Sequence, residues 1–184
     1  EDTLTGATAV QIDYDGDGNL DLYLANGGDR QLQPDALLAN GGDGRFRDVT
    51  ADARLPTGRT AHMAVVWGDV DGSGSPDLYA TNGWGMGNRL AVNSTPGNRF
   101  IRVAVQGRGP QNGRRSRDAI GTQVRLVDAV TGELRGYRQV LSGDNATGLI
   151  FGAPAGPYDV EVRFPGDTNF AVAQREVSGG QVVT

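Results

Sequence analysis

Short stretches in which hydrophobic and polar residues alternate recur along the whole chain, and they predict β-strands. Residues 20–24 read Leu-Asp-Leu-Tyr-Leu and run on to Asn26-Gly27-Gly28, as expected for a strand that ends in a turn. Residues 37–40 and 45–50 flank a glycine-rich turn and predict a hairpin. Helical stripes are few and the sequence contains 29 glycines, so the pattern favours an all-β protein.

An internal repeat appears when the chain is aligned with itself at a shift of 56 residues. Residues 13–23 (DYDGDGNLDLY) then match residues 69–79 (DVDGSGSPDLY). Each copy follows a small apolar run, at residues 7–12 and 63–67, and each continues to an Asn-Gly pair. One unit is therefore predicted to be a strand, an acidic loop, a second strand and a turn, followed by further strand material.

The pattern changes after Pro96-Gly97, where the strands become longer and no acidic loop occurs. We place a domain boundary there, between residues 1–97 and residues 98–184. The second part is predicted to be a small antiparallel β-sandwich or barrel, because strands recur at short intervals with turn residues between them. Its predicted strands are residues 100–105, 122–127, 134–141, 149–151, 158–164 and 170–177.

The acidic loop of the first repeat predicts a metal site. Carboxylates on alternate residues repel one another unless a cation lies between them, and oxygen ligands with a glycine at the sixth position suit Ca²⁺. Mg²⁺ is less favoured because it retains its water ligands. The twelfth position is Leu24, where an EF-hand needs a bidentate Glu, so an EF-hand is excluded. The expected ligands are Asp13, Asp15, Asp17 and Asp21, together with the backbone carbonyl of Asn19.

The second loop predicts a second Ca²⁺ site with one carboxylate fewer. A hydroxyl stands at Ser73, where the first loop has an acid, and we expect weaker binding because affinity follows ligand charge. In either loop the alternative is an acidic turn whose carboxylates accept hydrogen bonds from its own backbone. The expected ligands of the second site are Asp69, Asp71, Ser73, Ser75 and Asp77.

Composition narrows the classes of function. The sequence of 184 residues carries a net charge of −5 and an acidic N-terminal part, which argues against nucleic acid as a partner. No apolar run approaches the roughly 20 residues of a membrane span, so membrane insertion is not expected. Cysteine is absent, which excludes disulfides and thiolate sites, and bound metal is then a candidate source of stability.

The two loops and their flanks, VQIDYDGDGNLDLYLANGG and VVWGDVDGSGSPDLYATNG, resemble FG-GAP/VCBS repeats, the calcium-binding blades of integrin-type β-propellers. Residues 98–184 resemble the ASPIC/UnbV domain through NRFIRVAVQG, NGRRSRDAIGTQVRL and YDVEVRFPG. The resemblance implies two propeller-blade-like repeats in an extracellular or cell-surface protein, most often bacterial. This chain departs from the family in having two units where a propeller has about seven, Ser73 in place of Asp, and Phe164 in place of Trp.

No enzyme is predicted, because no nucleophile motif accompanies His62, which is the single histidine. Two blade-like units leave sheet edges open, so a protein partner or self-association into an oligomer or filament is an alternative function. A third hypothesis is a fragment of a larger glycan-binding or glycan-active propeller protein. Trp67, Tyr79 and Trp84 could form a stacking surface for sugar, although core packing between the blades is the simpler interpretation. Arg114, Arg115 and Arg117 could hold an anion, although a solvated loop is the simpler interpretation.

Overall fold

The computed structural model describes residues 6–27, 34–55, 61–83, 85–107, 119–141, 148–154 and 156–184. Contacts divide the chain into two compact units. The first contains residues 1–14 and 19–94, and the second contains residues 15–18 and 95–184. No helix in the described part is long and apolar enough to cross a membrane.

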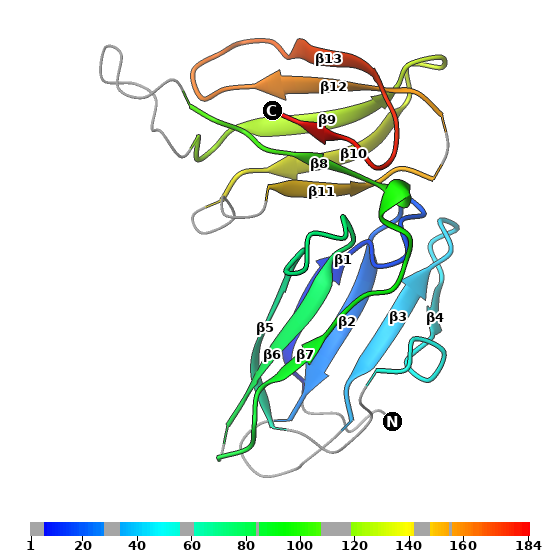
Figure 1. The fold of residues 1–184 in the computed structure, drawn as a ribbon, viewed down its shortest axis with the longest axis vertical. Helices are drawn as coiled ribbons and strands as arrows, with labels where there is room; N and C mark the ends of the chain where they lie inside the picture. The colour runs from blue at the N-terminus through cyan, green and yellow to red at the C-terminus, as the bar shows by residue number, and fades with distance from the viewer. Residues whose placement is uncertain are drawn as a thin grey trace. The chain divides into compact units, whose positions relative to one another are not determined.

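The first repeat forms a four-stranded antiparallel sheet in the order β1-β2-β3-β4, coloured blue to cyan in Figure 1. The predicted hairpin around the glycine-rich turn is confirmed, since β3 pairs with β4 and Leu38 lies opposite Asp48. The strands are β1 (Gly6–Ile12), β2 (Asp21–Asn26), β3 (Ala36–Asn40) and β4 (Phe46–Asp48).

The second repeat forms a sheet of the same design, in the order β5-β6-β7. Its register repeats that of the first sheet: Val66 pairs with Tyr79 and Tyr79 with Leu90, as Val10 pairs with Tyr23 and Tyr23 with Leu37. The sequence repeat is therefore a structural repeat. The strands are β5 (His62–Gly68), β6 (Asp77–Asn82) and β7 (Arg89–Ala91).

The two sheets share one hydrophobic core within the first unit. Because side chains alternate between the faces of a strand, each sheet offers one apolar face to the other. Tyr23 of β2 meets Trp67 of β5 edge-on, with ring centroids 5.8 Å apart. The buried members of this core are Tyr23, Ala25, Leu37 and Val49 from the first repeat, and Val65, Leu78 and Ala80 from the second.

The second unit contains two sheets (Figure 1). It has a hydrophobic core of its own. One sheet is antiparallel, in the order β10-β9-β12-β13, and the other has the order β11-β8-β14. A short 3₁₀ helix, η1 (Gly97–Arg99), precedes the first strand. The strands are β8 (Phe100–Val103), β9 (Gln123–Asp128), β10 (Leu134–Gln139), β11 (Leu149–Gly152), β12 (Tyr158–Arg163), β13 (Ala171–Val177) and β14 (Val182–Val183).

The all-β prediction is confirmed, and the second unit adds two details. Its described strands form two open sheets rather than one closed barrel, and Val124, Leu126, Phe151 and Val160 are buried between them. The two-residue strand β14 pairs in parallel with β8, whereas an antiparallel arrangement was expected. Strand β14 is too short for its alternation to be read from the sequence.

Candidate metal sites

Each acidic loop joins the first two strands of its repeat. The loop of residues 13–20 leaves β1 and enters β2, and the loop of residues 69–76 leaves β5 and enters β6. The sharp turn that was predicted at the sixth position is present in both, since Gly18 has φ 94° and Gly74 has φ 93°. A side chain at either position would be strained in this left-handed region, so glycine is required there.

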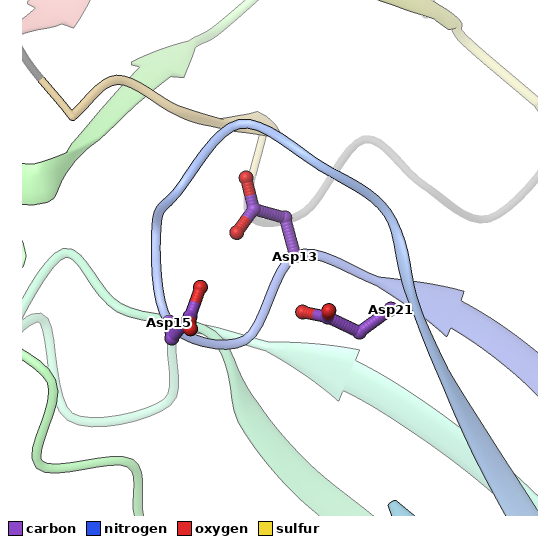
Figure 2. Close-up of side chains that lie close together, drawn as sticks. All are labelled: Asp13, Asp15 and Asp21. Atoms are coloured by element: carbon purple, nitrogen blue, oxygen red, sulfur yellow. The ribbon is translucent and has the colours of Figure 1, made fainter. Parts of the chain in front are cut away.

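In the first loop the structure brings together Asp13, Asp15 and Asp21. One carboxylate oxygen from each lies within 4.8 Å of the others, and Figure 2 shows the three side chains directed toward one another. Asp13 and Asp21 are buried, and Asp15 is half-buried. Three negative charges held this close and away from water strongly favour a bound cation.

In the second loop the repeat-equivalent residues Asp69, Asp71 and Asp77 converge in the same way, again within 4.8 Å. Asp69 and Asp77 are buried, whereas Asp71 is exposed. An Asp69 oxygen accepts the backbone N–H of Gly74 at 3.1 Å. The second group therefore has the same arrangement as the first, except that its middle carboxylate is exposed to solvent.

The aspartate at the ninth position also fixes the loop to the sheet. Asp21 accepts the N–H of Tyr14 at 3.1 Å through Oδ2 and the N–H of Asn40 at 2.8 Å through Oδ1. Asp77 accepts the N–H of Val70 and the N–H of Asn93, both at 2.8 Å. Each carboxylate thus joins the start of its loop to the third strand of its repeat, at the last residue of β3 in the first repeat and just beyond β7 in the second. The two loops therefore share part of their geometry because of these hydrogen bonds to the backbone, which need no metal.

Asn93 connects the two loops. Its backbone N–H donates a hydrogen bond to Asp77, and its carbonyl accepts one from the hydroxyl of Ser75 at 3.1 Å. Its side-chain amide donates to the carbonyl of Tyr14 in the first loop at 2.7 Å. The counterpart in the first repeat, Asn40, instead donates to Leu20 of its own loop at 3.0 Å.

The remaining predicted ligands lie outside the two carboxylate triads. Asp17 is not a member of the first group, although its N–H donates to Asp15 Oδ1 at 3.2 Å. The amide group of Asn19 lies beside Gly42, which is consistent with a ligand role for its backbone carbonyl rather than its side chain. The hydroxyls of Ser73 and Ser75 are hydrogen-bonded to each other at 2.9 Å, and Ser75 is fully buried.

The two loops differ in the electrostatics of their third position. Burial raises the pKa of the Asp15 carboxyl, and the charge of Asp17 raises it further. Hydrogen bonds from the side chain and the backbone of Ser73 instead lower the pKa of Asp71. Without a cation, the ionised form of Asp15 is therefore less favourable than the ionised form of Asp71. A bound cation would offset more of this unfavourable charge in the first loop.

The donor set fits Ca²⁺ in both loops. All side-chain donors are oxygens, three carboxylates converge in each loop, and further carbonyl and hydroxyl oxygens are present at neighbouring loop positions. Flexible oxygen-only coordination with several carboxylates is characteristic of calcium rather than of zinc or copper.

A second pair of equivalent residues could not be recognised from the sequence repeat alone. Asp35 accepts the hydroxyl of Tyr23 at 2.6 Å and the N–H of Asn26 at 2.8 Å. In the second repeat Asn88 takes this place, since it accepts the N–H of Asn82 at 3.1 Å and donates to Tyr79 Oη at 2.8 Å. The match requires a shift of 53 residues rather than 56, because the turn before the third strand is shorter in the second repeat.

The other candidates of the sequence are only partly described. Trp67 packs against Tyr23 in the core, which indicates a structural role. The side chain of His62 lies outside the described residues, as do Trp84 and the cluster Arg114, Arg115 and Arg117.

Residues 13–80 match the FG-GAP-like repeat family, and this stretch includes both acidic loops. No curated protein matches the chain. The match ends within β6, so the likeness of residues 98–184 to the ASPIC/UnbV domain stays a prediction. With the two sheets and their equivalent carboxylate triads, residues 13–80 are an FG-GAP-like repeat region.

Proposed function

We propose that the chain is an extracellular, non-enzymatic calcium-binding protein with a structural or interaction role. Two Ca²⁺ ions neutralise the Asp-rich loops and thereby stiffen the repeats. The observation that carries the proposal is the convergence of Asp13, Asp15 and Asp21 and its repetition by Asp69, Asp71 and Asp77. The FG-GAP-like repeat match over the same residues supports it.

Within each loop the ligands have different tasks. Asp13 and Asp69 are buried and would supply charge to the ion at the end of the first strand. The ninth-position carboxylates, Asp21 and Asp77, would bind the ion while they hold the third strand through backbone N–H groups. Bound Ca²⁺ would therefore stabilise the link between loop and sheet.

An extracellular location agrees with this chemistry. Calcium sites of extracellular modules work at 10⁻⁴ to 10⁻³ M, so a loop with few carboxylates can still be filled there. The second loop, with Ser73 and the exposed Asp71, suits such conditions. Residues 98–184, with their ASPIC/UnbV-like pattern, would then provide a surface for a protein partner.

Thermal unfolding with and without calcium tests the proposal. A ligand that binds only the folded state stabilises it by about 2.7 kcal/mol at a hundredfold excess over its dissociation constant, so EDTA should lower the melting temperature of the first unit. The double variant Asp13→Asn with Asp69→Asn should lose this calcium dependence. The matched control is Asp52→Asn, an exposed acid paired with Arg47 at 3.1 Å, which should retain it. A melting curve of the unaltered protein that EDTA leaves unchanged would contradict the proposal.

A further inference from the structure

The outer face of the second sheet carries a row of exposed apolar side chains. Val66, Tyr79 and Leu90 are direct neighbours across β5, β6 and β7. Their exposed fractions are 59%, 38% and 52%. Exposed apolar residues scattered singly are ordinary, but a continuous row across three strands marks an interaction surface.

The first repeat shows what covers a row of this kind. The equivalent residues Val10, Tyr23 and Leu37 form the same cross-strand row in β1, β2 and β3. There Tyr23 and Leu37 are 2% and 1% exposed, because the second sheet packs on them. The covering side chains are Val65, Leu78 and Ala80, which point to the opposite face of the second sheet.

The outward face of the first sheet is equivalent to the face of the second sheet that covers this row. The residues equivalent to Val65, Leu78 and Ala80 are Ala9, Leu22 and Leu24 on the outward face of the first sheet. Ala9 is exposed, and the two leucines are half-buried outside the core cluster. One chain therefore presents both halves of a sheet-to-sheet contact that it already makes once internally.

The polar atoms beside the exposed row already have partners. The hydroxyl of Thr81 accepts the N–H of Ala64 at 3.1 Å and donates to its carbonyl at 3.3 Å. Tyr79 Oη accepts a hydrogen bond from Asn88 at 2.8 Å. A partner sheet could cover this face without leaving these groups unsatisfied, which removes the main cost of burying polar atoms.

We propose that the row Val66–Tyr79–Leu90 is the docking surface for a second copy of the chain, which presents the outward face of its first sheet, with Ala9, Leu22 and Leu24. The contact is heterologous, since two different faces meet, and it repeats the packing found between the two sheets. This docking surface is separate from the calcium loops, and it lies on the face of a sheet rather than at an open edge.

The test is the association state of paired charge variants in calcium. Leu90→Arg blocks the exposed row, and Ala9→Arg blocks the complementary face; both positions are exposed, so the fold should tolerate the change. Val130→Arg, at the most exposed large hydrophobic residue among those described, is the control. Melting curves of all three variants verify that they fold.

Sedimentation velocity of the unaltered chain should show mass that rises with concentration up to about 1 mM, the weak end of specific association. Each blocking variant should weaken association by about tenfold or more, because an unpaired charge is buried in an apolar contact. An equimolar mixture of Leu90→Arg and Ala9→Arg should form a dimer, since each variant retains one intact face. A monomeric unaltered chain, association that survives both substitutions, or a mixture that stays monomeric would overturn the proposal.

Discussion

The side-chain amide of Asn93 donates a 2.7 Å hydrogen bond to the backbone carbonyl of Tyr14, although the two residues belong to different repeats. Asn93 also presents its backbone N–H to Asp77 and its carbonyl to Ser75 in the second loop. One residue therefore supports the geometry of both candidate calcium loops. Calcium in one loop should consequently favour the ordered form of the other.

Replacement of Asn93 by Ala should weaken calcium binding in the first loop, to which it contributes no ligand. The lost hydrogen bond is worth about 1 kcal/mol, so the affinity should fall roughly fivefold. Calorimetric titration in an Asp69→Asn background isolates the first loop. Asn88→Ala is the matched control, because Asn88 forms hydrogen bonds with Asn82 and Tyr79, which lie in β6 and not in an acidic loop. Equal first-loop affinities in the Asn93→Ala and Asn88→Ala proteins would refute the coupling.

Asp21→Asn and Asp77→Asn should destabilise the first unit even in EDTA. Each carboxylate accepts two backbone N–H groups, and an amide in its place offers one acceptor oxygen and brings a donor toward the other N–H. The free energy of unfolding should fall by about 1–3 kcal/mol in urea titrations. If both variants unfold like the original chain in EDTA, these residues act as metal ligands alone.

Asp15→Asn should have the opposite effect in EDTA. Because burial and the charge of Asp17 raise the pKa of Asp15, its ionised form is unfavourable in the metal-free fold. The neutral amide should therefore leave the metal-free melting temperature unchanged or raise it, while calcium should stabilise the variant less than the original chain. A lower melting temperature in EDTA would show that Asp15 supports the fold without metal.

The second unit should show an acid-dependent loss of stability at the turn between β9 and β10. The N–H groups of Thr131 and Val130 donate to Asp128 and lower its pKa. The stabilisation is therefore present above the unfolded-state pKa of about 3.9 and is lost as the pH falls through the lower folded-state pKa. Asp128→Asn should lower the melting temperature at pH 7, and the difference should disappear in acid.

Glu133→Gln tests whether the effect belongs to Asp128, since Glu133 lies in the same turn and pairs with Arg135 at 3.1 Å. That exposed ion pair should contribute little at any pH. Melting curves of the three proteins from neutral to acidic pH give the comparison. A Glu133→Gln protein that is as destabilised at neutral pH as the Asp128→Asn protein would contradict it.

Local patterns were sufficient to predict both acidic loops and the described strands other than the two-residue strand β14. Alternation predicted β2, and the spacing of Asp13, Asp15 and Asp21 predicted a convergence that the structure contains. Contacts between distant segments could not be read in this way. The bond from Asn93 to Tyr14 spans 79 residues, and the parallel pairing of β14 depends on where β8 lies.

Two equivalent tyrosines show that the burial of a side chain also cannot be predicted from local sequence. Tyr23 and Tyr79 occupy the same position in the repeated Asp-Leu-Tyr motif, yet one is 2% and the other 38% exposed. The sequence around each predicts a strand residue on one face of a sheet, but the burial depends on what packs against that face. Likewise Asp17 has the spacing of a ligand but lies outside the carboxylate triad, because the backbone path decides where each side chain points.

The number of calcium ions that the chain binds, measured by equilibrium dialysis, tests the two proposed calcium sites together. We expect two ions per chain, with the first loop filled at a lower calcium concentration than the second. Asp13→Asn should leave only the weaker site, and Asp69→Asn only the stronger one. Binding of no calcium at millimolar concentration, or binding that survives both substitutions together, would contradict it.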